Sequence, residues 1–97
     1  MYFITCFRKL ESEDEISDSR TFGFYSDFES CEEALNKNYM DMHEFYYYTA
    51  VVEEIDEGIH PHVEREFWFV WDEEREGFYR TEHKPDWSEG WVNFALG

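Results

Sequence analysis

The sequence has 97 residues, of which 24 are acidic and 8 are basic, so its formal net charge at pH 7 is −16. A compact chain of this length is about 32 Å across, and duplex DNA of that length carries about 19 phosphates. A negative field of similar size excludes direct binding to nucleic acids and to anionic membranes. Aromatic residues make up 22% of the chain, which excludes a disordered polyanion, because disordered segments are poor in aromatic residues.

The length predicts a single domain over residues 1–97. No apolar run approaches the roughly 20 residues that cross a bilayer. Residues 1–8 lack the basic start, apolar stretch and cleavage site of a signal peptide, so we expect a cytoplasmic protein. Cys6 and Cys31 are then expected to be reduced and buried, with a disulfide between them as the alternative.

The first part of the chain predicts two strands. Residues 1–8 alternate between two apolar faces, which is typical of an interior strand. Residues 9–20 are polar and predict a solvated loop or a hairpin connection. Residues 21–25 predict the second strand, in which Gly23 marks either a β-bulge or a close approach of the backbone.

A helix is predicted over residues 27–38. Ser26 and Glu29 match a capping box at its N-terminus, in which each side chain satisfies a free backbone N–H. Apolar side chains then recur at helical spacing and form one stripe. The stripe consists of Phe28, Cys31, Ala34 and Leu35.

The second half of the chain predicts three more strands. They span residues 44–54, 66–72 and 78–82. A hairpin turn over residues 73–77 joins the last two strands, with Gly77 free to adopt a positive φ. The apolar tail, residues 91–96, is expected to dock on the body of the domain.

The order β-β-α-β-β-β along the chain predicts an α+β fold. We expect a mostly antiparallel sheet of about five strands, with one main helix packed on a face. One helix is too small to cover such a sheet fully. The rest of the sheet surface is therefore expected to carry exposed aromatic residues or to be covered by the tail.

No motif predicts catalysis, a cofactor or a metal site. His60, His62, Glu64 and Glu66 lie close in sequence, but their spacing matches no established zinc pattern, and an exposed loop is the simpler interpretation. The chain has no glycine-rich phosphate loop, no nucleophile elbow and no Cys-x-x-Cys. We therefore expect a protein that is not an enzyme.

The acidic segments predict an interaction protein that binds a basic protein surface, of the kind found on nucleic-acid-binding proteins. Such a protein would act as a nucleic-acid mimic or as an inhibitor. The candidate partner-binding residues are Glu11, Glu13, Asp14, Glu15 and Asp18 in the loop, Glu29, Glu32 and Glu33 on the helix, and Asp72, Glu73, Glu74 and Glu76 at the hairpin. The alternative is that the acidity only keeps an aromatic-rich domain soluble.

A small-molecule or protein binding domain of unknown ligand is the second interpretation. Four arginines are the natural anion holders in so acidic a chain: Arg8, Arg20, Arg65 and Arg80. Two or more of them converging in a concave aromatic site would favour this interpretation over the first. The aromatic residues of 46–48 and 67–71 are expected to pack in the core, with a protein-binding surface as the alternative.

Four stretches carry a resemblance to known proteins. They are Arg20-Thr21-Phe22-Gly23-Phe24-Tyr25, Gly58-Ile59-His60-Pro61, Phe67-Trp68-Phe69-Val70-Trp71-Asp72 and Asn93-Phe94-Ala95-Leu96-Gly97. Over nearly its whole length the chain resembles short acidic proteins of unknown activity from Firmicutes-type bacteria, their phages and other mobile elements. The resemblance implies no functional residues. By analogy it implies a setting in which small acidic proteins inhibit nucleic-acid-handling machinery, anti-CRISPR proteins among them.

Overall fold

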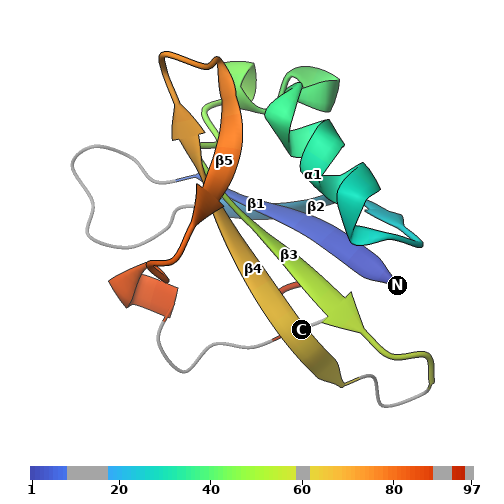
Figure 1. Cartoon of the computed structure of the whole chain (residues 1–97). Coiled ribbons are helices and arrows are strands. Elements are labelled where there is room, and N and C mark those ends of the chain that lie inside the picture. Colours follow the sequence, from blue (N-terminus) through green and yellow to red (C-terminus); the bar gives the residue numbers. More distant parts are fainter. Residues whose placement is uncertain (9–17, 59–61, 89–92, 96–97) are drawn as a thin grey trace.

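The computed structural model describes residues 1–8, 18–58, 62–88 and 93–95. Five strands form one antiparallel sheet in the order β2-β1-β3-β4-β5 (Figure 1). The strands are β1 (Tyr2–Arg8), β2 (Asp18–Tyr25), β3 (Thr49–Ile55), β4 (Val63–Asp72) and β5 (Gly77–Thr81). The helices are α1 (Phe28–Asn36) and three 3-10 helices, η1 (Tyr39–Asp41), η2 (His43–Phe45) and η3 (Asp86–Ser88). The predicted α+β fold and the order β-β-α-β-β-β are confirmed.

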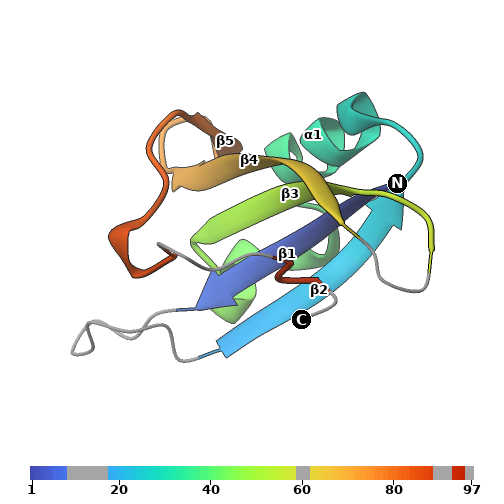
Figure 2. The same ribbon diagram turned by 90° about the horizontal axis from the view of Figure 1, so that it is seen from below.

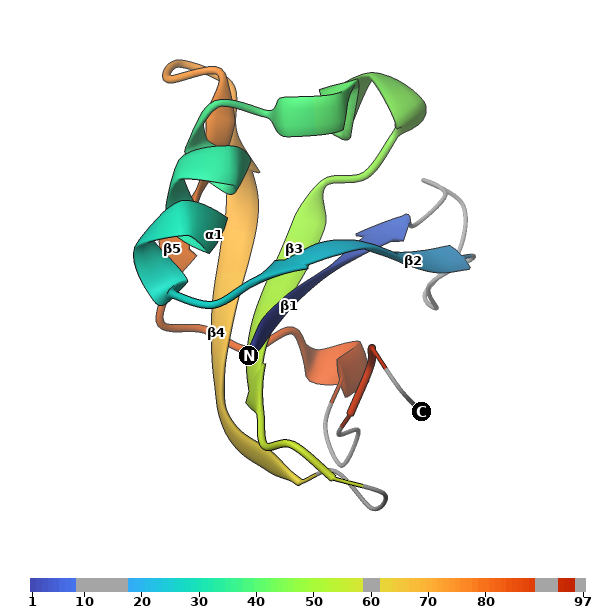
Figure 3. The ribbon, with the colours of Figure 1, turned by 90° about the vertical axis from the view of Figure 1, so that its right-hand side faces the viewer.

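The two faces of the sheet have different covers. Figures 2 and 3 show α1 on one side of the sheet and η3 with residues 93–95 on the other. We call these sides the helix face and the tail face. Within the described segments, α1 is the longest helix, and its nine residues are far too few to cross a membrane.

On the helix face, the apolar stripe of α1 packs on the sheet. Cys31 and Leu35 are completely buried there, together with Phe69 of β4 and Phe78 of β5. The stripe exists because the helical repeat places residues three and four apart on one side of the helix. This face therefore holds the larger part of the core.

On the tail face, a smaller aromatic cluster is buried. Phe7, Val51 and Trp68 form its centre, and Trp87 and Phe94 pack against them. The two faces meet in β1, where every residue from Ile4 to Phe7 is buried, as expected for an interior strand. Residues 93–95 of the predicted docking tail lie on the body, and the rest of the tail lies outside the described residues.

The predicted capping box at the start of α1 is wrong. Asp27 is the N-cap: its Oδ2 accepts a hydrogen bond from the backbone N–H of Ser30 at 3.2 Å, and its Oδ1 accepts one from the Ser30 hydroxyl at 2.7 Å. Ser26 and Asp27 are both good capping residues, so the local pattern did not separate them. The helix also ends at Asn36, two residues before the predicted end.

The predicted strand over residues 44–54 begins too early. Strand β3 starts at Thr49, because the preceding chain forms η2 and Tyr46 takes a left-handed φ of 70°. Met42 is buried at the start of this turn, with its Sδ 3.3 Å from Cys6 Sγ. The side chain of Met42 fills the core, and the backbone turns around it instead of extending.

Two other strands begin earlier than predicted. Strand β2 starts at Asp18, because Asp18 pairs with Arg8 across the β1–β2 ladder. Strand β4 starts at Val63, which pairs with Ile55. Residues 9–17 of the predicted acidic loop lie outside the described residues.

Gly23 and Gly77 are required by different features of the fold. The ladder between β1 and β2 shifts register beside Gly23, so the predicted β-bulge is confirmed. The predicted positive φ of Gly77 is wrong, because Glu76 takes the left-handed conformation, with a φ of 53°. A Cβ at Gly77 would collide with the carbonyl oxygen of Asn36, so this glycine allows the end of α1 to touch β5.

Candidate functional site

The predicted partner-binding acids lie on separate elements. Asp18 begins β2, Glu29, Glu32 and Glu33 lie on α1, and Asp72, Glu73, Glu74 and Glu76 lie at the β4–β5 hairpin. Glu11, Glu13, Asp14 and Glu15 lie outside the described residues. The described members therefore divide into three groups, on β2, on α1 and at the hairpin.

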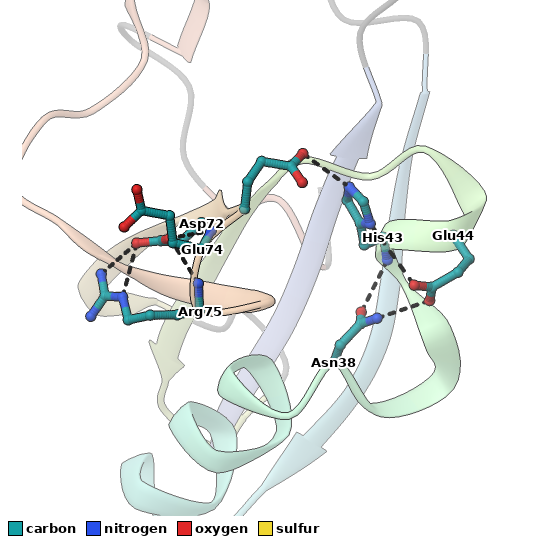
Figure 4. Close-up of polar contacts among 7 residues, drawn as sticks. Asn38, His43, Glu44, Asp72, Glu74 and Arg75 are labelled. Carbon is teal, nitrogen blue, oxygen red and sulfur yellow. Dashed lines mark hydrogen bonds and ion pairs between the residues drawn. The ribbon is translucent and has the colours of Figure 1, made fainter.

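Asp72 organises the hairpin itself. Its Oδ1 accepts hydrogen bonds from the backbone N–H groups of Glu74 at 3.0 Å and of Arg75 at 3.1 Å. Its Oδ2 lies 2.8 Å from Nη2 of Arg75 (Figure 4). These bonds lower the pKa of Asp72, first through the backbone N–H of Arg75. The exposed carboxylates of the turn are therefore Glu73, Glu74 and Glu76.

His43 connects the hairpin to the turn after α1. Its ring stacks on Trp71 with centroids 3.7 Å apart and an interplanar angle of 4°. Its Nδ1 lies 3.9 Å from Glu44 Oε1, and its Nε2 lies 3.9 Å from Glu73 Oε1. Asn38 supports this turn by accepting a hydrogen bond from the backbone N–H of His43 at 3.0 Å and donating one to Glu44 at 2.8 Å (Figure 4).

Three aromatic side chains are exposed beside these carboxylates. Phe45 is 58% exposed, Tyr46 is 64% exposed and Tyr48 is 42% exposed. The backbone N–H of Trp71 donates to the carbonyl of Tyr48 at 2.9 Å, which joins the turn to the end of β4. We call the group of Glu44, Phe45, Tyr46, Tyr48 and Glu73 the acidic–aromatic end.

The expected core packing of residues 46–48 is therefore only partly right. Tyr47 is 3% exposed, whereas Tyr46 and Tyr48 point to solvent. The alternation of aromatic residues is typical of a strand, but the left-handed φ of Tyr46 breaks it. The aromatic side chains of 67–71 are buried or half-buried as expected.

A concave feature, which we call the arginine pocket, lies at the N-terminal end of α1. It is a cavity of about 410 Å³ whose lining includes Arg65, Arg80, Phe28, Phe67 and Glu29. The guanidinium carbons of Arg65 and Arg80 lie 5.5 Å and 4.7 Å from the centroid of the Phe67 ring. Two of the four candidate arginines thus converge in a concave aromatic site, which is the arrangement expected of a small-molecule binding domain.

The other two candidate arginines lie elsewhere. Arg8 lies over Tyr47, with its Nη2 3.9 Å from Asp18. Arg20 lies over Phe22, 5.1 Å from the ring centroid. Neither lines the arginine pocket.

Sequence reasoning missed Glu53, which is completely buried on the tail face. Its Oε2 accepts a hydrogen bond from the backbone N–H of Phe94, and its Oε1 accepts one from that of Ala95, each at 2.9 Å. Burial raises the pKa of Glu53, and these two N–H groups oppose the shift. A signal was present, because Glu53 continues the buried face of Val51 along β3.

The cysteines are not placed as nucleophiles. Cys6 and Cys31 are free and buried, as predicted. Burial raises the pKa of the Cys31 thiol to about 12, and it raises the pKa of Cys6 far above the ordinary thiol range. A reactive thiolate needs the opposite environment, exposed and electropositive.

Within the described residues, no three His, Cys, Asp or Glu side chains gather as metal ligands. His62 is exposed, and His60 lies outside the described residues. No protein-family model matches the chain, and neither a curated protein nor a solved structure shows significant similarity to it.

Proposed function

We propose that this protein is a non-enzymatic binding protein that captures a basic segment of a partner protein at its acidic–aromatic end. The observation that carries the proposal is the exposure of Phe45, Tyr46 and Tyr48 in the turn that contains Glu44 and His43, where the His43 ring lies 3.9 Å from Glu73 Oε1. Aromatic side chains are favoured anchors at protein interfaces, and their ring faces attract arginine and lysine. The neighbouring carboxylates supply charge-assisted hydrogen bonds to the same cations.

These exposed rings gain little from burial of their own surface. Tyr46 has a left-handed φ of 70°, and this conformation costs residues other than glycine about 1–2 kcal/mol of free energy. Its side chain remains 64% exposed, so burial of the ring does not offset this strain. Adjacent exposed aromatic residues are typical of interaction sites.

The net charge of −16 supports a basic partner. Complementary potentials accelerate encounter, and the binding they produce weakens as salt is added. Proteins that handle nucleic acids present arginine and lysine surfaces of this kind. Together with the resemblance to acidic phage proteins, this chemistry favours a nucleic-acid-binding protein as the partner.

A matched pair of variants tests the aromatic contribution. Phe45 and Phe24 are both 58% exposed, but Phe24 lies on β2, outside the acidic–aromatic end. We expect Phe45→Ser to weaken the binding of a synthetic arginine- and lysine-rich peptide roughly tenfold, and Phe24→Ser to change it less than about twofold. Equal effects of the two substitutions would contradict the proposal and favour acidity that serves solubility alone.

A second pair tests the contribution of charge. Glu44→Gln with Glu73→Gln removes two charges at the acidic–aromatic end, and Glu57→Gln with Glu64→Gln removes two exposed charges elsewhere. Fluorescence anisotropy at about 50 mM and about 300 mM salt measures the peptide affinity of both double variants. The first double variant is expected to lose more affinity and more of the salt dependence than the second.

The mimicry form of the proposal makes a separate prediction. A basic nucleic-acid-binding protein that binds this chain should release it when duplex DNA is added, because both would occupy one surface. If DNA and this chain bind the partner together, the chain is a binder of basic surfaces but not a nucleic-acid mimic.

A further inference from the structure

Arg65 and Arg80 form a cationic pair in a chain with three times as many acids as bases. Arg80 also approaches Phe28, with its guanidinium carbon 5.6 Å from the ring centroid. The rings of Phe28 and Phe67 are 4.6 Å apart and form one apolar wall. The two cations therefore share a common aromatic surface.

Two of the carboxylates near this pair, Asp27 and Glu54, already have partners. Asp27 accepts both of its hydrogen bonds from Ser30 at the helix cap. Glu54 accepts a hydrogen bond from Nε of Arg65 at 2.7 Å and one from the hydroxyl of Tyr2 at 2.8 Å. Glu54 thus orients Arg65 without extending its own hydrogen bonds to Arg80.

Arg80 differs from its neighbour Arg65 in its ion pairs. Within the described part of the chain, no ion pair joins Arg80 or Arg20 to a carboxylate, whereas Arg8, Arg65 and Arg75 each pair with one. The side chain of Arg80 stays exposed above the wall of Phe28 and Phe67. A guanidinium in this position can offer its forked N–H donors to an anion.

We propose that the arginine pocket binds a small organic anion, a carboxylate or a phosphate monoester carried on a flat apolar group. Arg80, with Arg65 beside it, holds the anionic group, and the rings of Phe28 and Phe67 contact the apolar part. The volume of about 410 Å³ lies in the range of small-molecule sites. This site is independent of the proposed function, because it needs none of the acidic–aromatic end.

The net negative charge of the chain does not prevent such binding. At about 0.1 M salt the Debye length is about 10 Å, so carboxylates farther away are largely screened. The Arg80 guanidinium lies over Phe67, which is five residues from Asp72 on β4, or about 16 Å of extended strand, so the hairpin acids lie outside this range. Asp27 and Glu29 both line the pocket and oppose an anion, and Glu29 is the one that can be neutralised without removing the cap of α1.

Titration with benzoate and with phenyl phosphate at about 0.1 M salt tests the site. Binding is followed by the NMR signals of the arginine Nε–H groups. We expect saturable shifts at Arg80 and Arg65 and none at Arg20. A stronger response to one probe identifies its anionic group as the preferred one. Equal binding of uncharged benzyl alcohol, or the absence of a saturable shift with either anion, would overturn the proposal.

Matched variants separate the pocket from a general effect of charge. Arg80→Gln is expected to weaken the binding of the anion at least about tenfold. Arg20 is also an exposed arginine over a phenylalanine, and Arg20→Gln is expected to weaken binding less than about twofold. Arg80→Lys keeps the charge without the forked donors and should give an intermediate loss, which retains the test if Arg80→Gln disturbs the fold. Equal losses in Arg80→Gln and Arg20→Gln would contradict the pocket.

A gain of affinity provides the sharpest test. Glu29→Gln removes an opposing charge from the pocket and is expected to increase the affinity for the anion severalfold. Glu32→Gln makes the same charge change one turn along α1, outside the lining, and should have a smaller effect. A purely structural role of Arg65 and Arg80 would not produce this gain, and unchanged affinity in Glu29→Gln would contradict the proposed anion position.

Discussion

The helix face and the tail face of the sheet are closed by different physical means. On the helix face, α1 packs completely buried side chains such as Leu35 onto the sheet. On the tail face, the backbone of Phe94 and Ala95 is bound by the carboxylate of Glu53. The first cover depends mainly on apolar burial, whereas the second also depends on an ionisable group. Only the tail face is therefore expected to respond directly to pH through its cover.

The aromatic residues of the tail face share this dependence. Phe94 lies 5.1 Å from Phe7 and 5.5 Å from Trp68 between ring centroids, and Trp87 lies 4.9 Å from Phe7. The two hydrogen bonds to Glu53 hold Phe94 in this cluster. On the tail face a polar contact between residues distant in sequence thus positions an apolar side chain. On the helix face the apolar side chains of α1 themselves hold the cover in place.

The largest expected effect is on the helix face. Phe69→Ala empties a completely buried site and should lower the free energy of unfolding by about 3–5 kcal/mol. Phe94→Ala on the tail face should have a clearly smaller effect, because Phe94 is only half-buried. Urea unfolding followed by circular dichroism measures both, and equal losses would contradict the difference between the faces.

Gly77→Ala tests the close contact between α1 and β5. The new Cβ would meet the carbonyl of Asn36, so we expect a loss of about 1–3 kcal/mol in the free energy of unfolding. Gly23→Ala is the matched control, because no atom lies within 4 Å of its added Cβ. Thermal unfolding of both variants compares them, and an unchanged midpoint in Gly77→Ala would contradict this contact.

The cap of α1 gives a smaller effect. Asp27→Ala removes the side chain that accepts from Ser30, and it should lower the free energy of unfolding by about 1 kcal/mol. Ser26→Ala should have almost none, because Ser26 is not the cap. A larger loss in the free energy of unfolding for Ser26→Ala than for Asp27→Ala, measured by urea unfolding, would instead support the capping box predicted from the sequence.

The pH dependence of Glu53 is the smallest effect, because burial and hydrogen bonding act on its pKa in opposite directions. Burial prevails and raises the pKa above the value of about 4.3 expected in the unfolded chain. The native state then binds the proton more tightly. The contribution of Glu53 to stability is therefore fully present below about pH 4 and is lost as the pH rises through the native pKa.

Glu53→Gln isolates this contribution. The free energy of unfolding of the unsubstituted protein minus that of the variant should fall as the pH is raised from about 4 to about 7. Glu33, Glu54 and Asp72 have lowered pKa values and act in the opposite direction, but they are present in both proteins and cancel in the difference. A difference that rises with pH would show that the N–H groups of Phe94 and Ala95 outweigh burial.

The two proposed sites differ in how far the sequence predicted them. Glu73 was a candidate from the charge pattern, but the exposure of Tyr46 and Tyr48 was only the alternative to core packing, because their alternation matches a strand. The buried side chain of Met42 and the turn of η2 decided that exposure. Adjacent residues in a sequence do not reveal which of them a distant core will accept.

The arginine pocket likewise could not be predicted from the sequence, although its residues were candidates. All four candidate arginines were visible in the sequence, yet only Arg65 and Arg80 converge. They do so because β4 and β5 are neighbours and their register pairs Arg80 with Phe69, two residues along β4 from Phe67. Register depends on the hairpin, which the charge pattern does not encode.

The sequence by itself determined the types and order of the elements, the stripe of α1 and the two apolar faces of β1. Local periodicity suffices for these features, because a helix or a strand repeats its faces every few residues. Only the tertiary structure decided that Glu53 binds residues 41 and 42 positions away, that Gly77 touches Asn36 and that Arg65 meets Arg80. These features depend on groups that the folded chain brings together from distant positions, and a local pattern carries no record of such partners.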